Sequence, residues 1–260
     1  FTCKQCPGGT YSNVTGAYEC VDCAAGTFTP IDGAINCVPC LVGTYQPSPG
    51  QESCFRCEAG TFTNKTGSKI CDDCDPGTYQ AFSAQRVCES CPIGKYADDK
   101  GEVECVNCDP GKFAAEEGMA ECELCPAGYA QIAPGMANCE PCPAGSFSYQ
   151  GSAECQPCPF GKISEKAGSA SCFTCDRNSV PDKDRTKCIC AVGFAAVYDN
   201  TTEGGSRCDP CPLGAICDYN GTVWETMLTR PGYWEALSGE FYRCPYEYYC
   251  AGGVETGDLQ

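Results

Sequence analysis

Residues 6–23 read CPGGTYSNVTGAYECVDC, and the pattern in this stretch decides the fold. It starts on the second cysteine of one Cys-x-x-Cys pair and ends on the next pair, Cys20 and Cys23. The step between pairs is 17 residues nine times and 16 once, between Cys139 and Cys155. A fixed period of this kind predicts a tandem array. The eleven pairs lie at 3/6, 20/23, 37/40, 54/57, 71/74, 88/91, 105/108, 122/125, 139/142, 155/158 and 172/175.

Two glycines and one aromatic residue share this register. A first glycine lies three residues after the second cysteine of each pair, as at Gly9, and a second lies four before the next pair, as at Gly16. Ala84 replaces the second glycine once. Glycine at both shoulders predicts tight turns and short β-hairpins, and no helical period runs over three turns. We expect the aromatic two residues after the first glycine to pack between repeats: Tyr11, Phe28, Tyr45, Phe62, Tyr79, Tyr96, Phe113 and Phe147, with Ala130 and Ile163 as departures.

The composition favours covalent cross-links over a large apolar core. Cysteine supplies 29 of 260 residues, a fraction typical of disulfide scaffolds. One cross-link per repeat offsets only part of the entropy lost on ordering it, so each repeat should depend on its neighbours. We predict a small disulfide-rich fold with minor β structure: an elongated rod of ten ~17-residue loops, followed by an irregular, aromatic-rich module.

Charge and residue usage exclude several classes of function. The chain has no histidine, which removes the commonest general base and metal-binding imidazole. Its net charge of −17 disfavours nucleic acid and anionic membranes as partners. No apolar run reaches the ~18 residues of a membrane span, and no leader precedes Phe1. We therefore expect a processed or incomplete non-enzymatic chain, with no cofactor and no membrane span in this segment.

The same cysteine spacing approximates that of a zinc ribbon. The unbroken run of pairs, the sequons described below and the lack of histidine favour disulfides instead. A thioredoxin-like redox pair needs a strand before it and a helix after it, and eleven copies indicate a structural role.

The simplest pairing closes each glycine-aromatic loop, from the second cysteine of one pair to the first of the next. Joining first to first and second to second cysteines of neighbouring repeats is the main alternative. Under this pairing Cys3 has no partner. We interpret Cys3 as the closing cysteine of a preceding repeat. The expected bonds are Cys6–Cys20, Cys23–Cys37, Cys40–Cys54, Cys57–Cys71, Cys74–Cys88, Cys91–Cys105, Cys108–Cys122, Cys125–Cys139, Cys142–Cys155 and Cys158–Cys172.

The repeat pattern C-P-x-G-x-Y/F…G-x-x-x-C-x-x-C resembles the ephrin-receptor-like cysteine-rich repeats of large extracellular proteins, over residues 3–175. A single loop, such as Cys6 to Cys20, is also similar to the two-cysteine loop of tumour necrosis factor receptors, which closes in the same way. The crossed four-cysteine module of those receptors is absent, so their ligand recognition is not implied.

The regular spacing ends after Cys175. Residues 188–194 resemble the second half of an EGF-like domain, and residues 231–253 resemble a segment that follows such repeats in large protist surface proteins. We divide the chain into a ladder (3–175), an EGF-like half module (176–211) and an aromatic-rich cysteine module (212–260) that continues beyond Gln260. In the last two we expect Cys175–Cys188, Cys190–Cys208, Cys211–Cys217 and Cys244–Cys250.

The aromatic-rich segment holds both tryptophans, Trp224 and Trp234. They predict either a local core or a contact surface, since Trp and Tyr anchor many interfaces. Acidic residues between Asp98 and Glu123 indicate a solvated flank or a calcium site, although no D-x-D-x-D-G loop is present. Paired carboxylates for glycoside hydrolysis lack a pocket in so short a repeat.

Four Asn-x-Ser/Thr sequons predict N-linked glycans and a secretory route: Asn13, Asn64, Asn200 and Asn220. Asn13 and Asn64 occupy the same position three repeats apart. We expect an extracellular or cell-surface structural glycoprotein that self-associates or binds other extracellular glycoproteins. The resemblance to protist surface proteins favours a filament subunit of a mastigoneme-like appendage. The alternative is the stalk of a receptor or adhesion protein.

Overall fold

The computed structural model describes residues 4–198, 206–236, 240–245 and 250. In this part of the chain the strands form fourteen two-stranded antiparallel sheets, and one 3-10 turn, η1, covers Trp224–Thr226. The predicted class, a small disulfide-rich fold with minor β structure in tandem repeats, is confirmed. By its internal contacts the chain divides into two compact units, Phe1–Cys125 with Gln131–Cys139, and Pro126–Ala130 with Glu140–Gln260.

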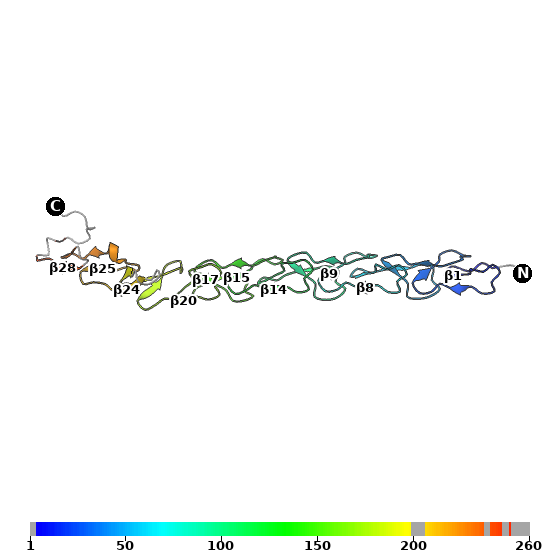
Figure 1. Cartoon of the computed structure of the whole chain (residues 1–260), viewed down its shortest axis with the longest axis horizontal. Helices are drawn as coiled ribbons and strands as arrows, with labels where there is room; N and C mark the ends of the chain where they lie inside the picture. Colours follow the sequence, from blue (N-terminus) through cyan, green and yellow to red (C-terminus); the bar gives the residue numbers. More distant parts are fainter. Residues whose placement is uncertain (1–3, 199–205, 237–239, 246–249, 251–260) are drawn as a thin grey trace. The chain divides into compact units, whose positions relative to one another are not determined.

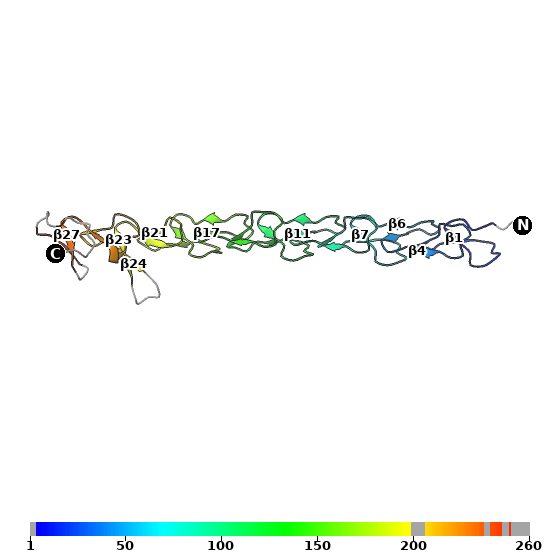
Figure 2. The same ribbon diagram turned by 90° about the horizontal axis from the view of Figure 1, so that it is seen from above.

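Each hairpin joins one strand from each side of a loop, and the hairpins of each unit follow chain order (Figures 1 and 2). We number the repeats 1 to 10 by their opening cysteines, Cys6, Cys23, Cys40, Cys57, Cys74, Cys91, Cys108, Cys125, Cys142 and Cys158. Their hairpins are β1 (Thr10–Tyr11) with β2 (Val21–Asp22), β3 (Thr27–Phe28) with β4 (Val38–Pro39), β5 (Thr44–Tyr45) with β6 (Phe55–Arg56), β7 (Thr61–Phe62) with β8 (Asp72–Asp73), β9 (Thr78–Tyr79) with β10 (Glu89–Ser90), β11 (Lys95–Tyr96) with β12 (Val106–Asn107), β13 (Lys112–Phe113) with β14 (Glu123–Leu124), β15 (Tyr129–Ala130) with β16 (Glu140–Pro141), β17 (Ser146–Phe147) with β18 (Gln156–Pro157) and β19 (Lys162–Ile163) with β20 (Phe173–Thr174).

Longer hairpins follow the ladder. They are β21 (Ser179–Pro181) with β22 (Cys188–Cys190), β23 (Phe194–Tyr198) with β24 (Ser206–Pro210), β25 (Ala215–Ile216) with β26 (Leu228–Thr229) and β27 (Tyr233–Glu235) with β28 (Phe241–Arg243).

From repeat 1 to repeat 8, four backbone hydrogen bonds join each repeat to the next, as repeats 3 and 4 illustrate. The N–H of Gly43, the first glycine of repeat 3, donates to Thr63 O at 2.8 Å, and Gln46 N–H donates to Ser68 O at 3.0 Å. In the reverse direction, the second glycine of repeat 4, Gly67, donates to Cys40 O at 2.8 Å. The N–H of the opening Cys57 donates to Gly43 O at 2.9 Å. Because backbone donors and acceptors pair across every such boundary within a unit, the repeats form a ladder rather than a string of independent loops.

Repeats 1 to 6 and repeat 8 also contact their second neighbours through glycine. A Cβ added to Gly60 of repeat 4 would lie 2.0 Å from the carbonyl oxygen of Gly101 in repeat 6. Any residue with a side chain would therefore clash at this position. The same clash occurs between Gly9 and Gly50, at 2.2 Å. Within a unit, odd-numbered repeats therefore contact odd-numbered ones, and even-numbered repeats contact even-numbered ones.

Repeat 9, whose loop is shorter, still shares three of these backbone hydrogen bonds with repeat 10. Its disulfide spans 13 residues instead of 14. Gly168 N–H still donates to Cys142 O at 2.8 Å, and Cys158 N–H donates to Gly145 O at 2.9 Å. The deletion is absorbed in the exposed part of the loop.

The regular ladder ends at substitutions for its glycines. Asn178 occupies the first-glycine position with φ 69°, a conformation that Asn tolerates better than most residues. At the position of the second glycine stands Asp184. The carbonyl of Cys158, which a backbone N–H would satisfy in a regular repeat, instead accepts a hydrogen bond from the guanidinium of Arg185.

The same backbone pattern returns beyond this point. Gly193 N–H donates to Cys217 O at 2.8 Å, Ala196 N–H to Thr222 O at 2.8 Å and Gly221 N–H to Cys190 O at 2.7 Å. Those bonds match the repeat-to-repeat bonds of the ladder position by position. The segments opened by Cys190 and Cys211 are thus divergent repeats, although their cysteine spacing differs.

A pair of glycine substitutions separates backbone strain from steric exclusion. Gly60 and Gly67 both have positive φ, 81° and 74°, but an added Cβ would meet a backbone oxygen at 2.0 Å only at Gly60. At Gly67 the nearest atom would be Pro39 Cβ, at 3.6 Å. We expect Gly67→Ala to cost about 1–2 kcal/mol and Gly60→Ala at least about 3 kcal/mol of unfolding free energy, measured by denaturant titration with disulfides intact.

Repeat 5 supplies the control, because Ala84 already occupies the second-glycine position with φ 62°. Ala84→Gly should stabilise the ladder by about 1 kcal/mol by relieving that strain. Equal losses for Gly60→Ala and Gly67→Ala would contradict the second-neighbour contact.

Candidate functional site: the disulfide ladder and its exposed surface

The structure joins the ladder cysteines in loop-closing pairs, from Cys6–Cys20 through Cys158–Cys172. Beyond the ladder it pairs Cys175–Cys188, Cys190–Cys208, Cys211–Cys217 and Cys244–Cys250. Cys3 lies outside the described residues. A disulfide sulfur is no thiolate, so cysteines paired in this way are not ligands for zinc.

Burial is concentrated on the opening cysteines. The opening cysteines of repeats 2 to 10 are fully buried, whereas the closing cysteines are half-buried or exposed. The disulfides thus fix the loops to the centre of the ladder, and the loop tips face solvent.

The predicted packing aromatics lie on the first strand of each hairpin. Tyr11, Phe28, Tyr45, Phe62, Tyr79, Tyr96 and Phe113 are half-buried, and Phe147 is buried. Each faces the residue that follows the closing cysteine on the partner strand, as Tyr45 faces Phe55. Their role in packing between repeats stays a prediction.

The residue six after the opening cysteine is the buried position that sequence reasoning missed. It is buried in repeats 2 to 10, as Thr29, Gln46, Thr63, Gln80, Ala97, Ala114, Gln131, Ser148 and Ser164. The sequence does show small or amide side chains at this position in every one of these repeats. Most of them are polar, so the pattern did not indicate a buried position.

Three of these side chains are glutamines whose amides hold the loop. Gln80, 3% exposed, donates from Nε2 to Val87 O at 2.8 Å, and its Oε1 accepts from Phe82 N–H at 3.1 Å. Gln46 and Gln131 make the same two bonds in their own repeats. A buried amide therefore shapes the loops of repeats 3, 5 and 8.

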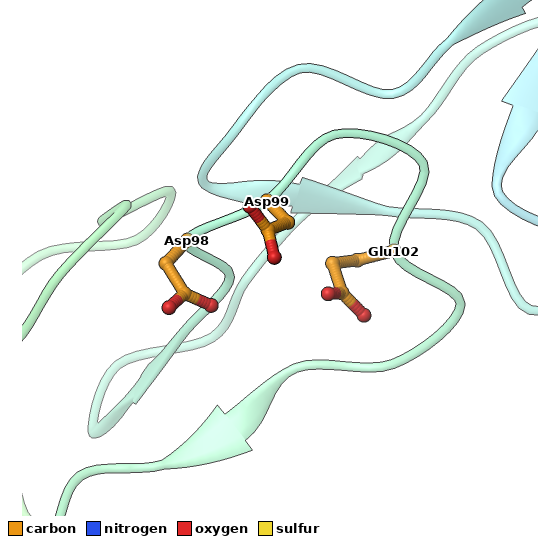
Figure 3. Close-up of side chains that lie close together, drawn as sticks. All are labelled: Asp98, Asp99 and Glu102. Atoms are coloured by element: carbon orange, nitrogen blue, oxygen red, sulfur yellow. The ribbon is translucent and has the colours of Figure 1, made fainter.

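Three carboxylates of repeat 6 converge at the surface (Figure 3). Oxygens of Asp98, Asp99 and Glu102 lie within 4.8 Å of one another, and the first two side chains are exposed. Carboxylate oxygens are ligands for calcium. The nearby Lys100 forms an exposed ion pair with Asp75 at 3.3 Å. An exposed acidic flank explains this cluster without a bound ion.

The sequons differ in their surroundings. Asn13 and Asn64 are exposed, as are their hydroxyl residues Thr15 and Thr66. Asn200 lies outside the described residues. Asn220 is exposed, but its Oδ1 accepts from Val192 N–H at 3.0 Å.

The aromatic-rich segment divides between a core and a surface. Trp224 and Phe241 pack against a buried cluster of Ala195, Ala215, Cys217 and Met227. By contrast, Trp234 and Tyr242 stack on each other across β27 and β28, with ring centroids 5.5 Å apart, and remain 44% and 45% exposed. A hydrogen bond to the Glu240 carboxylate, reinforced by its charge, raises the pKa of Tyr242.

A hollow of about 450 Å³ lies between the β21–β22 and β23–β24 hairpins and is lined by Arg177, Lys187 and Arg207. Carboxylates accompany these cations. Arg207 pairs with Asp209 at 3.0 Å. Burial by itself would raise the pKa of Asp182. The carboxylate accepts hydrogen bonds from the N–H groups of Thr186 and Lys187 and from the Thr186 hydroxyl, and it lies near the charge of Lys187. Together these interactions outweigh burial and lower the pKa of Asp182. Asp176 in the lining, with Asp209 beside Arg207 and Asp182 beside Lys187, therefore offsets much of the positive charge of the hollow.

Comparison with known families matches four overlapping segments of the ladder, residues 1–36, 32–74, 60–101 and 94–135, to the family described as tyrosine-protein kinase ephrin type A/B receptor-like. Together they cover residues 1–135, just over half of the 260-residue chain. The chain belongs to this ephrin-receptor-like family. No curated protein matches it.

Ephrin-receptor-like repeats and the many disulfides indicate an extracellular or cell-surface protein. The family also favours a non-enzymatic ectodomain, either receptor-like or structural. Within the described residues, no helix has the length and apolar character that crossing a bilayer requires.

Removing a buried amide tests the role of the glutamine loops. We expect Gln80→Ala to lower the free energy of unfolding by about 1–3 kcal/mol, because Val87 O and Phe82 N–H lose their partner. Gln85→Ala is the matched control, since that half-buried side chain makes one bond of 3.3 Å, to Ser83 O. Its cost should stay below about 0.5 kcal/mol. Similar losses in both variants, measured by denaturant unfolding, would refute this role.

Proposed function

We propose that this chain is part of an extracellular structural glycoprotein, a rod-like subunit of a fibrous surface appendage resembling a mastigoneme. The observation that supports this most is the set of backbone hydrogen bonds between consecutive repeats, which repeats without side-chain specificity. Such a ladder transmits tension and bending through main chain and disulfides, as a filament requires.

The matched family favours a second candidate. Ephrin-receptor-like repeats suit the stalk or ectodomain of a receptor or adhesion protein that holds another domain away from the membrane. Negative-stain imaging of native material distinguishes the two. Continuous filaments containing this chain support the first, and separate rods of fixed length support the second.

N-linked glycans complete the proposal. The exposed side chains of Asn13 and Asn64 project from the same loop position, so their glycans would coat the ladder at a three-repeat interval. Asn200 and Asn220 are proposed acceptors in the segment that follows.

The sequon hydroxyls give a matched set of variants. We expect Thr15→Ala and Thr66→Ala each to abolish one glycan without loss of stability, because both side chains are exposed. Thr222→Ala should remove the Asn220 glycan and also cost about 1–2 kcal/mol, because the 1%-exposed Thr222 hydroxyl donates to Tyr219 O at 3.0 Å. Mass spectrometry after enzymatic glycan release and thermal unfolding measure the two effects. Unmodified Asn13 and Asn64 in protein from secreting cells would refute the glycan proposal.

A further inference from the structure

The first three repeats differ from the rest of their unit in charge. Residues 6–57 carry five charged side chains, whereas residues 58–125 carry twenty. Like-charge repulsion opposes the approach of two copies of a chain with net charge −17. Among repeats 1 to 7, that repulsion is weakest along repeats 1 to 3.

Three apolar cross-strand pairs are exposed in this region, Phe28 with Val38 in repeat 2 and one pair in each of repeats 1 and 3, which contact each other. Tyr11 faces Val21 in repeat 1, and Tyr45 faces Phe55 in repeat 3, where the two rings are 5.8 Å apart. Val21 and Phe55 are each 55% exposed. We call the four residues of repeats 1 and 3 the apolar patch.

Repeats 1 and 3, which carry the two halves of the apolar patch, touch directly. A Cβ added to Gly9 would lie 2.2 Å from Gly50 O, and one added to Gly50 would lie 3.3 Å from the Asp22 carboxyl group. The pattern stops at repeat 5, where Tyr79 faces Glu89 and donates a hydrogen bond to it at 3.2 Å.

Opposite charges flank the apolar patch at equivalent positions. Asp22 follows Val21, and Arg56 follows Phe55; both are exposed, and neither forms an ion pair within the described residues. Arg56 is the one basic residue at this position among the ten repeats.

We propose that the apolar patch binds the apolar patch of a second copy of this chain in an antiparallel, two-fold arrangement, and this inference rests on the proposed filament function. In a two-fold contact, repeat 1 of one copy faces repeat 3 of the other. Asp22 of each copy then meets Arg56 of its partner, and Val21 meets Phe55. The charges that flank the apolar patch are thus complementary to themselves only when the two chains run in opposite directions.

Sedimentation equilibrium of the secreted, disulfide-bonded chain tests the pairing. The wild-type chain should form a reversible dimer. Asp22→Arg and Arg56→Asp should each raise the dissociation constant at least about tenfold, and the double variant should return it to within about threefold of wild type. Failure of the double exchange to restore the dimer would overturn the antiparallel contact.

The ladder itself supplies a variant of the apolar surface that keeps the fold. Val21→Glu with Phe55→Glu places in repeats 1 and 3 the residue that repeat 5 carries naturally as Glu89. This variant should be monomeric with unchanged circular dichroism. A dimer of unchanged affinity would count against the apolar patch.

Imaging of native material separates this proposal from the filament function. Filaments, together with a wild-type chain that stays monomeric, would overturn the patch contact and leave the filament standing. Dimers that respond to the variants, together with native material lacking filaments, would support the contact and overturn the filament.

Discussion

The contact between a first glycine and a carbonyl oxygen two repeats later constrains the whole ladder. At Gly60 the missing side chain lets the main chain of repeat 6 approach to a distance that no Cβ allows. Main chain packs on main chain at the centre of each unit, where an ordinary domain would place apolar side chains. Only sulfur, small groups and folded-back amides fit the remaining space, which explains why opening cysteines and their companions six residues later are the buried set.

This arrangement leaves the outward positions free to change. The residue opposite the aromatic is Val21, Val38 or Phe55 in the first three repeats and Asp72 or Glu89 in the next two. None of these substitutions disturbs the bonds between repeats, because those bonds are formed by backbone groups. Surface chemistry can therefore vary along the ladder at constant geometry, which suits a protein that presents different contacts at different points.

Periodicity predicted what depends on backbone geometry. The two glycine positions, the loop-length hairpins and the ephrin-receptor-like resemblance all followed from a register of 17 residues. The buried position filled by Gln46, Thr63 or Ala97 escaped prediction because its residues share small size or a satisfied amide, not hydrophobicity. Contacts between second neighbours also escaped, since a repeat in sequence gives the spacing of units and not the way they pack.

The divergent repeats show which part of the pattern is essential. Cys211 pairs with Cys217, only six residues away, yet the N–H groups of Gly193, Ala196, Gly221 and Cys211 make all four hydrogen bonds of a regular boundary. With the loop-spanning disulfide gone, Met227 and Trp224 pack against Cys217 and Ala215, so a small apolar cluster replaces the covalent closure. The backbone hydrogen bonds of the ladder thus recur in this region although its cysteine spacing differs. The backbone bonds and the glycines that permit them define the repeat, and the disulfide is one of two means of holding its loop.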